Sequence, residues 1–185
     1  MTIHEVLQLG HPVLRTVAEA VPHDEISSPT VQTLCEDLVQ TMRHKNGAGL
    51  AAPQIGVQFR VAVLEVNNNP RYPYKPKIPL TIAINPILTP INEETFENFE
   101  GCLSVPGLRG IVKRYRNLHV QYTDPLGVVH EQEVTGLTAG TWQHECDHLD
   151  GLLFVDRLVS TASLTTWDNF KAFYETDFVE SISGL

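Results

Sequence analysis

The spacing of apolar residues predicts three helices. In residues 29–45 apolar side chains recur every three or four positions, which is one face of an amphipathic helix, and the dipeptide Asn46-Gly47 ends it. Residues 137–149 are expected to form a second helix that Gly151 stops. A last helix is expected over residues 164–174.

Between these helices, β-branched and alternating segments predict a set of strands. They cover residues 59–66, 81–88, 96–100, 118–124 and 128–134, the last two forming a hairpin. Residues 47–56 are rich in Gly and Ala and predict a loop. Residues 67–79 hold four prolines in thirteen residues, which excludes a helix or a central strand. We interpret this segment as a tolerated surface insertion, with a role in shaping the entrance of a site as the alternative.

The chain of 185 residues has the length of one ordinary domain and shows no internal repeat or linker. Helices and strands that do not alternate strictly are typical of the α+β class. We therefore expect a single α+β domain over residues 1–185, divergent in its tail from about residue 160. Antiparallel or mixed sheets would pack around the central helix at residues 137–149.

Charge and composition limit the kinds of partner and the compartment that we expect for the chain. The net charge of −9 disfavours direct, specific binding of nucleic acid, which requires a basic face. No apolar run is long enough to cross a bilayer, and residues 1–5 lack the features of a secretory signal. Three cysteines are too few for a disulfide framework, and an odd number leaves at least one unpaired. The cysteine count therefore favours a reducing cytoplasm. The cysteines are Cys35, Cys102 and Cys146.

The predicted helix at residues 137–149 carries the sequence His144-Glu-Cys-Asp-His148. Residues four apart share one helix face, so both imidazoles can reach one metal ion. Glu145 lies at the edge of that face and can take a proton from water whose pKa a divalent ion lowers. The alternative is a helix with two partly exposed histidines. Apolar neighbours such as Trp142 and Leu149 favour a buried helix, where a metal would satisfy the imidazoles.

A catalytic site of this type needs a third protein ligand. Downstream acids are one choice, Asp150 or Asp156, and would suit a zinc endopeptidase. The upstream choice is Cys102, inside a segment at residues 100–107 whose proline and glycines favour a tight loop. Cys102 could equally be a small buried apolar residue. A structural metal site without an open position is a further alternative, and it would leave Glu145 without a role.

Three segments together resemble a known family. Residues 47–56 (GAGLAAPQIG), 100–104 (EGCLS) and 143–151 (QHECDHLDG) are similar to the three signature motifs of the peptide deformylases, in the order of that family. The resemblance extends from about Leu9 to Arg157.

The resemblance implies that the metal ligands are Cys102, His144 and His148. It also implies that Glu145 is the general acid and base, while Gln54 and the backbone N–H of Leu103 donate hydrogen bonds to the developing oxyanion. The ion implied by the family is Fe²⁺, with Zn²⁺, Ni²⁺ or Co²⁺ able to occupy the site. Ligand type alone would favour zinc.

The implied reaction is removal of the N-formyl group from nascent formylmethionyl peptides, which releases formate. Gly49 would bind an extended substrate through its backbone. Arg109 falls where the family has an arginine near the substrate, with a plain surface charge as the alternative.

Two features depart from the family pattern. Gly140 and Thr141 stand where bulky apolar residues commonly line the methionine pocket, so we expect a wider or differently walled pocket and question a strict methionine preference. Family members that dock on the ribosome are thought to use a basic C-terminal helix. Residues 165–185 hold four acids and one lysine, so any ribosome association is expected to use another surface.

Overall fold

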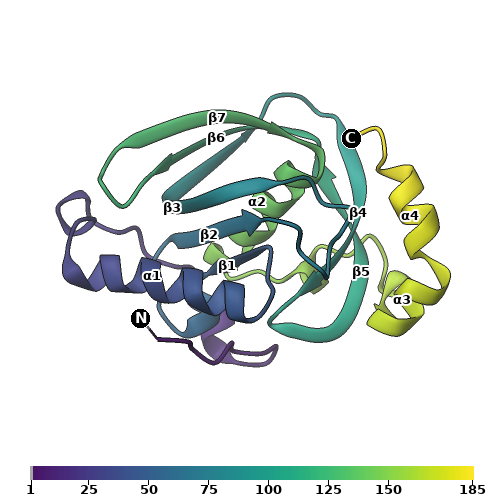
Figure 1. The fold of residues 1–185 in the computed structure, drawn as a ribbon, viewed down its shortest axis with the longest axis horizontal. Coiled ribbons are helices and arrows are strands. Elements are labelled where there is room, and N and C mark those ends of the chain that lie inside the picture. The colour runs from purple at the N-terminus through teal and green to yellow at the C-terminus, as the bar shows by residue number, and fades with distance from the viewer. Residues whose placement is uncertain (1) are drawn as a thin grey trace.

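Two antiparallel sheets pack against a central helix in the computed structural model, which describes residues 2–185 (Figure 1). The larger sheet has the order β1-β2-β3-β6-β7 and the smaller β4-β5-β8. The strands are β1 (Gly49–Ala51), β2 (Val61–Val66), β3 (Ile78–Pro90), β4 (Thr95–Cys102), β5 (Val105–Tyr115), β6 (Asn117–Thr123), β7 (Val129–Thr135) and β8 (Thr165–Thr166). The helices are α1 (Pro29–His44), α2 (Gly136–Leu149), α3 (Trp167–Phe173) and α4 (Glu175–Ser181). This architecture confirms the predicted α+β fold with α2 at its centre.

Helix α1 follows the sequence prediction closely. The Ser28 hydroxyl accepts a hydrogen bond from the backbone N–H of Val31, which caps the first turn, and Asn46 leaves the helix with a φ of 53°. The apolar face, including Leu38 and Met42, is buried against the larger sheet. Burial of each such side chain contributes about 1.5–3 kcal/mol, which fixes α1 on that face.

Strand β2 has helices on both sides. Val61 and Val63 belong to the cluster of buried residues under α1, whereas Ala62 and Leu64 pack with residues of α2. Alternating side chains point to opposite faces of a strand, so α1 and α2 cover opposite faces of the sheet. A strand covered on both faces is apolar throughout, as this segment is.

Helix α2 is buried on nearly all sides, and this position explains its composition. Cys146 and Leu149 pack with Ala51 and Ala62 of the larger sheet. His144 and His148 face the smaller sheet instead, so Cys146 points away from them, as predicted. The helix ends at Leu149, and the turn after it contains Gly151, whose φ of 73° is the left-handed conformation that glycine adopts readily. None of the helices within residues 2–185 is long and apolar enough to span a membrane.

Three elements differ from the sequence prediction. Residues 49–51 form strand β1 rather than a loop. The sequence did not predict it, because three residues are too few to show an alternating pattern. Strand β5 was not predicted because Pro106 and Gly107 near its start resemble a turn, yet it pairs with β4 along its length. The last helix is shorter than predicted and is followed by a second, α4. Phe170 and Phe178 bury both helices against the smaller sheet.

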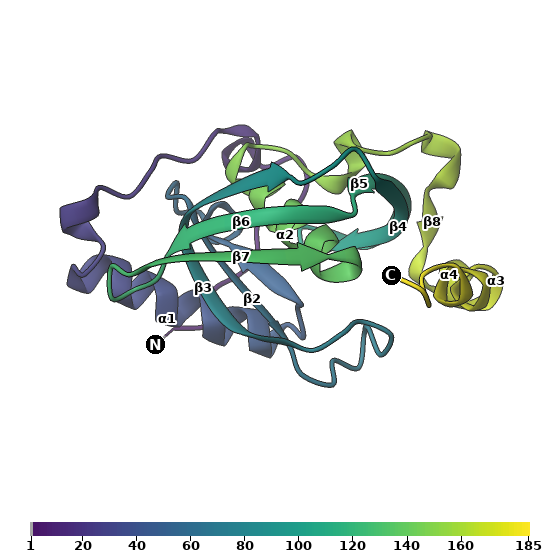
Figure 2. The same cartoon turned by 90° about the horizontal axis from the view of Figure 1, so that it is seen from above.

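The prediction of a tolerated surface insertion at residues 67–79 was wrong. Asn69 donates hydrogen bonds to the carbonyls of Asn46 and Gly47, both at 3.1 Å, and Tyr72 is only 7% exposed. The Tyr72 ring meets Trp167 of α3 edge-on, with 6.3 Å between centroids. Figure 2 shows the segment leaving β2 and returning to β3 at the end of the molecule that carries α3 and α4. Residues 67–77 are irregular, but strand β3 already begins at Ile78 and includes Pro79, and the prolines did not prevent burial.

The turn after α2 should be sensitive to a single methyl group. In Gly151→Ala the new Cβ would lie 2.9 Å from the carbonyl carbon of Arg15, in addition to the strain of a positive φ. We expect a loss of about 2–4 kcal/mol in the free energy of unfolding, measured by urea titration of the metal-loaded protein. Gly127→Ala is the matched control, because its φ is 81° but no heavy atom lies within 4 Å of the new Cβ. Equal losses in the two variants would contradict the steric explanation.

Candidate metal centre and adjoining pocket

Cys102, His144 and His148 converge at the place where β4 meets α2. Their ligand atoms all lie within 4.8 Å of one another, and Cys102 Sγ is 3.3 Å from His148 Nε2. The two imidazole rings stand nearly perpendicular at 87°, with 5.0 Å between centroids. Cys102 ends strand β4, and the histidines lie one turn apart on α2. The structure thus brings together the three residues that the resemblance implied.

The chemistry of these three groups fits a divalent metal ion. Burial would raise the pKa of the Cys102 thiol, but the imidazoles of His148 and His144 hold it well below its ordinary value. A deprotonated thiol together with two imidazoles is a donor set typical of Zn²⁺, Fe²⁺ and related ions. Within residues 2–185 it is the only cluster of this kind.

A buried chain of charges orients the cluster. Glu100 accepts hydrogen bonds from His144 Nδ1 at 2.8 Å and from the Nε and Nη2 atoms of Arg114 at 2.8 and 2.9 Å. Arg114 Nη1 also donates to Asp147 at 2.6 Å, and Arg157 donates to the other oxygen of Asp147. Burial opposes ionisation of Glu100, but Arg114 lowers the pKa of this carboxyl strongly. These interactions fix the His144 ring so that Nε2 faces Cys102.

The sequence did not lead us to predict that Glu100, Arg114 and Asp147 orient the cluster of metal ligands. Glu100 and Asp147 stand inside the segments that carry the family resemblance, which is the one signal that could have marked them. Arg114 stands outside these segments. Only the pairing of β5 with β4 brings it beside both acids.

Glu145 occupies a confined position beside strand β1. Its side chain is 4% exposed, and Oε2 has no hydrogen-bond partner among the described residues. A Cβ on Gly49 would lie 2.3 Å from Glu145 Oε1, so a larger residue at position 49 would force the Glu145 side chain to move. Burial raises the pKa of Glu145 against the opposing effect of His144 and His148. A carboxyl with a raised pKa suits proton transfer near neutral pH.

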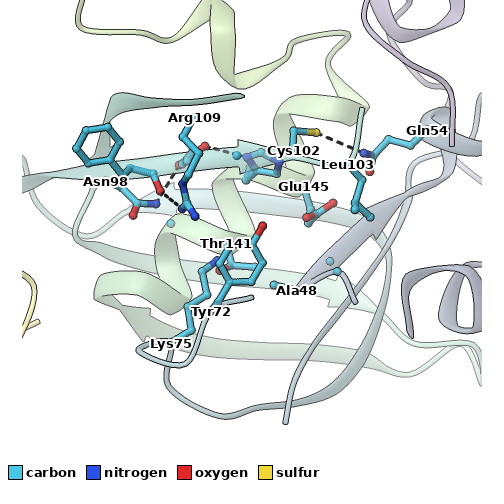
Figure 3. Close-up of a pocket in the computed structure, with 17 residues that line it drawn as sticks. Ala48, Gln54, Tyr72, Lys75, Asn98, Cys102, Leu103, Arg109, Thr141 and Glu145 are labelled. Carbon is cyan, nitrogen blue, oxygen red and sulfur yellow. Dashed lines mark hydrogen bonds and ion pairs between the residues drawn. The ribbon is translucent and has the colours of Figure 1, made fainter. Parts of the chain in front are cut away.

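Gln54 presents an amide donor to the same cluster. Its Oε1 accepts the backbone N–H of Ala51 at 2.8 Å, which orients the side chain. Its Nε2 donates to Ser104 at 3.1 Å and lies 3.6 Å from Cys102 Sγ. Leu103 follows Cys102 in the turn between β4 and β5 and lines the same pocket (Figure 3).

The two acids considered as alternative ligands lie elsewhere. Asp150 accepts a hydrogen bond from Arg60 at 2.7 Å and is largely exposed. Asp156 pairs with Arg15 and accepts the backbone N–H of Leu153 at 2.7 Å. Neither belongs to the cluster, so an endopeptidase site with an acidic third ligand has no support in this geometry.

The wall of the pocket differs from the expectation in one respect. Gly140 does not leave an open space, because a Cβ there would come 3.2 Å from Phe96 Cζ and 3.3 Å from Asn98 Nδ2. Thr141 Oγ1 accepts a hydrogen bond from Lys75 Nζ at 2.9 Å. Gly140 and Thr141 both line the pocket, and the neighbours of Gly140 leave no open space beside it.

Arg109 is not a surface charge, because it is only 1% exposed. Its Nη2 donates to the carbonyl of Phe99 at 2.5 Å and to the Tyr74 hydroxyl at 3.1 Å. Its Nε and Nη1 have no hydrogen-bond partner among the described residues. The side chain lines the pocket with Lys75 and Thr141.

Fold and site together are those of a hydrolase of the His-Glu-x-x-His class, with three residues that could hold a metal ion beside the helical glutamate. The sequence model of the polypeptide deformylase family matches residues 3–163. The chain therefore belongs to the polypeptide deformylase family.

Similar proteins and similar solved structures support the same family assignment. Peptide deformylase 1 of Prochlorococcus marinus is 48% identical over 164 residues, covering 88% of this chain and 84% of that protein. Peptide deformylase of Leptospira biflexa is 43% identical over 87% of this chain and 90% of its own. A crystal structure of class I type b peptide deformylase from Acinetobacter baumannii with bound Met-Ala-Ser matches with a TM-score of 0.81 and 36% identity. It covers 85% of this chain and 99% of that one.

The charge chain predicts a clear contrast between two arginines. Arg114→Met should lower the free energy of unfolding by about 3–5 kcal/mol, because it leaves Glu100 and Asp147 buried without their partner. Metal affinity should also fall by about 10–100-fold, because Glu100 would no longer be held against His144.

Arg43→Met is the matched control for that variant. Arg43 makes the same two-point contact with Glu65, but the arginine is 47% exposed. Its loss should cost about 1 kcal/mol or less and leave metal affinity unchanged. Urea titration and competition with a chelator measure the two quantities. Similar behaviour of both variants would rule out the orienting role of Arg114.

Proposed function

We propose that the chain removes the N-formyl group from the N-terminal formylmethionine of newly made peptides, with one divalent metal ion held by Cys102, His144 and His148. The observation that carries the proposal is the convergence of these three ligand atoms within 4.8 Å, next to Glu145 on the same helix. We infer Fe²⁺ as the native ion from the family resemblance. Zn²⁺, Ni²⁺ or Co²⁺ are proposed as replacements, because thiolate and imidazole ligands suit them as well.

In the proposed reaction Glu145 carries the proton. The bound ion would polarise the formyl carbonyl and make water a stronger nucleophile. Glu145 accepts a proton from the attacking water and returns it to the departing amine, for which a buried carboxyl with a raised pKa is suited. Formate and a free amino terminus are the products.

Two donors are proposed for the oxygen that gains negative charge. Gln54 Nε2 is aimed at the cluster because Ala51 holds the other end of its amide. The backbone N–H of Leu103 is the second donor, in the turn that follows Cys102. Donors that are already in position before charge develops need not reorganise, and loss of one typically costs about 10²–10³-fold in rate.

The edge of the larger sheet offers a place for the peptide chain. Strand β1 pairs only with β2, so it is the edge strand beside Glu145. An extended peptide can add to such an edge through backbone hydrogen bonds, here at Gly49. Arg109 is proposed to lie near the bound peptide, since it lines the adjoining pocket.

We infer a cytoplasmic location and no direct binding of specific nucleic acid. All three cysteines are free, which is typical of a reducing compartment. Helices α3 and α4 are acidic, so association with the ribosome through them is not proposed. We propose residues 1–185 as one catalytic domain, divergent from about residue 160, near the point where the family match ends.

Two cysteines on facing elements test the ligand set. Cys102→Ser should lose its metal during gel filtration with a mild chelator, whereas wild type keeps about one ion per chain. Cys146→Ser is the control, since Cys146 is also buried but packs with Ala51 and Ala62. Metal analysis by mass spectrometry measures both. Retention of metal in Cys102→Ser, with loss in Asp150→Asn or Asp156→Asn, would favour the endopeptidase alternative instead.

The proton carrier is tested by Glu145→Gln, which keeps the shape of the side chain and removes its basicity. Metal-loaded variant and wild type are compared for formate release from formyl-Met-Ala-Ser under anaerobic conditions. We expect kcat/KM to fall by about 10²–10⁴-fold while metal content is unchanged. Metal-replete wild type that releases no formate would refute the proposed activity. A fully active variant would refute the role of Glu145 alone.

A further inference from the structure

The ring of Trp167, at the start of α3, lies against the side chain of Arg109. Strand β8 pairs with β5 so that Thr165 is the partner of Arg109. The Thr166 hydroxyl then accepts the backbone N–H of Asn169, which caps α3 and starts the helix at the next residue. This register brings the centre of the Trp167 ring to 4.7 Å from Arg109 Cζ.

Aromatic rings, and not carboxylates, surround the Arg109 guanidinium. The centres of the Phe170 and Tyr72 rings lie 4.3 and 5.5 Å from the same Cζ. Within residues 2–185 no ion pair includes Arg109. The face of an aromatic ring attracts a cation, most strongly for tryptophan and where water is excluded, and Arg109 is only 1% exposed. Two of the three rings belong to α3, so this helix contributes to holding the guanidinium in place.

Part of the hydrogen-bonding capacity of Arg109 remains available to a ligand. Its Nη2 donates to the Phe99 carbonyl and to the Tyr74 hydroxyl, whereas Nε and Nη1 have no partner in the described part of the chain. Figure 3 shows the side chain extending from β5 into the pocket that Cys102 and Glu145 also line. Donors that are buried and unpaired are costly. A carbonyl oxygen of a bound peptide would satisfy them.

Trp167 also borders a second cavity close to the candidate metal ligands. Together with Arg71, Gly101 and Cys102, it lines a hollow at the end of β4. Arg71 Cζ lies 5.6 Å from the centre of the Trp167 ring, and the Tyr72 ring meets that ring edge-on. A residue of the C-terminal part of the chain thus reaches the surroundings of the site.

We propose that Trp167 is a positioning residue for the substrate, which holds the Arg109 guanidinium so that Nε and Nη1 can donate to a backbone carbonyl of the bound peptide. The proposal rests on the proposed deformylase function and adds to it a residue outside the family match, which ends at residue 163. Without the Trp167 ring, Arg109 keeps its Nη2 hydrogen bonds but loses one of the three rings that fix its orientation. The peptide is then held less tightly, whereas the groups proposed to act on the formyl carbonyl are unchanged.

The test replaces Trp167 by leucine, which keeps an apolar side chain and removes the aromatic face. In metal-loaded Trp167→Leu, KM for formyl-Met-Ala-Ser should rise by about tenfold, the loss expected for one buried cation–π contact. The value of kcat should change by less than about threefold, because the contact holds substrate and transition state alike. Trp167→Phe should recover most of the loss. Phe173→Ala should keep the wild-type KM, since Phe173 lies on the same helix but is 71% exposed.

A double-mutant comparison tests whether Trp167 acts through Arg109. Arg109→Met should raise KM by a similar factor, and adding Trp167→Leu to it should raise KM by less than about twofold more, because the two residues act as one unit. An unchanged KM in Trp167→Leu, or a fall in kcat or metal content in its place, would overturn the proposal. So would full additivity of the two changes, or a Trp167→Phe variant that behaves like Trp167→Leu.

If wild type hydrolyses no formyl peptide, the proposed function fails, and the role of Trp167 is judged by binding alone. Calorimetry with the unformylated peptide Met-Ala-Ser then compares metal-loaded wild type, Trp167→Leu and Trp167→Phe. Weaker binding in Trp167→Leu that Trp167→Phe restores supports the positioning role. Equal binding in all three proteins, or no binding to wild type, overturns it.

Discussion

The buried guanidinium of Arg114 is the interaction on which the site depends. It joins Glu100 of β4 to Asp147 of α2, and these two elements carry Cys102 and the two histidines. Charges removed from water are costly unless their hydrogen bonds are nearly complete. Here each oxygen of Glu100 and Asp147 has a partner, so the network is stable and specific. It aligns ligands that lie more than forty residues apart in sequence.

A second constraint is the close approach of strand β1 to the Glu145 carboxyl. No side chain fits between them, so Gly49 sets the distance between the edge of the larger sheet and the proposed proton carrier. The same edge is free to pair with an extended peptide. Gly49 therefore lets the Glu145 carboxyl lie buried against the backbone of β1, the edge along which the peptide is proposed to bind.

The groups proposed for the chemistry and the groups that line the adjoining pocket come largely from different parts of the chain. The groups proposed to act on the formyl carbonyl come from the three segments that resemble the family, and relatives at 40–48% identity are named peptide deformylases. The adjoining pocket draws on residues 67–79, on Asn98 and on Thr141, where this chain departs from the apolar pattern expected of the family.

Local patterns in the sequence determined α1, α2, the β6–β7 hairpin and the pairing of His144 with His148, because each depends on residues close together along the chain. Residue spacing left Cys102, Asp150 and Asp156 open as the third ligand. The family resemblance implied Cys102, and the tertiary structure brings Cys102 to the histidines. It also decided that β5 brings Arg114 and Arg109 to the site, and that a proline-rich segment buries Tyr72 and delivers Lys75. These contacts join segments distant in sequence, and no local periodicity records which distant segment will pack against a given one.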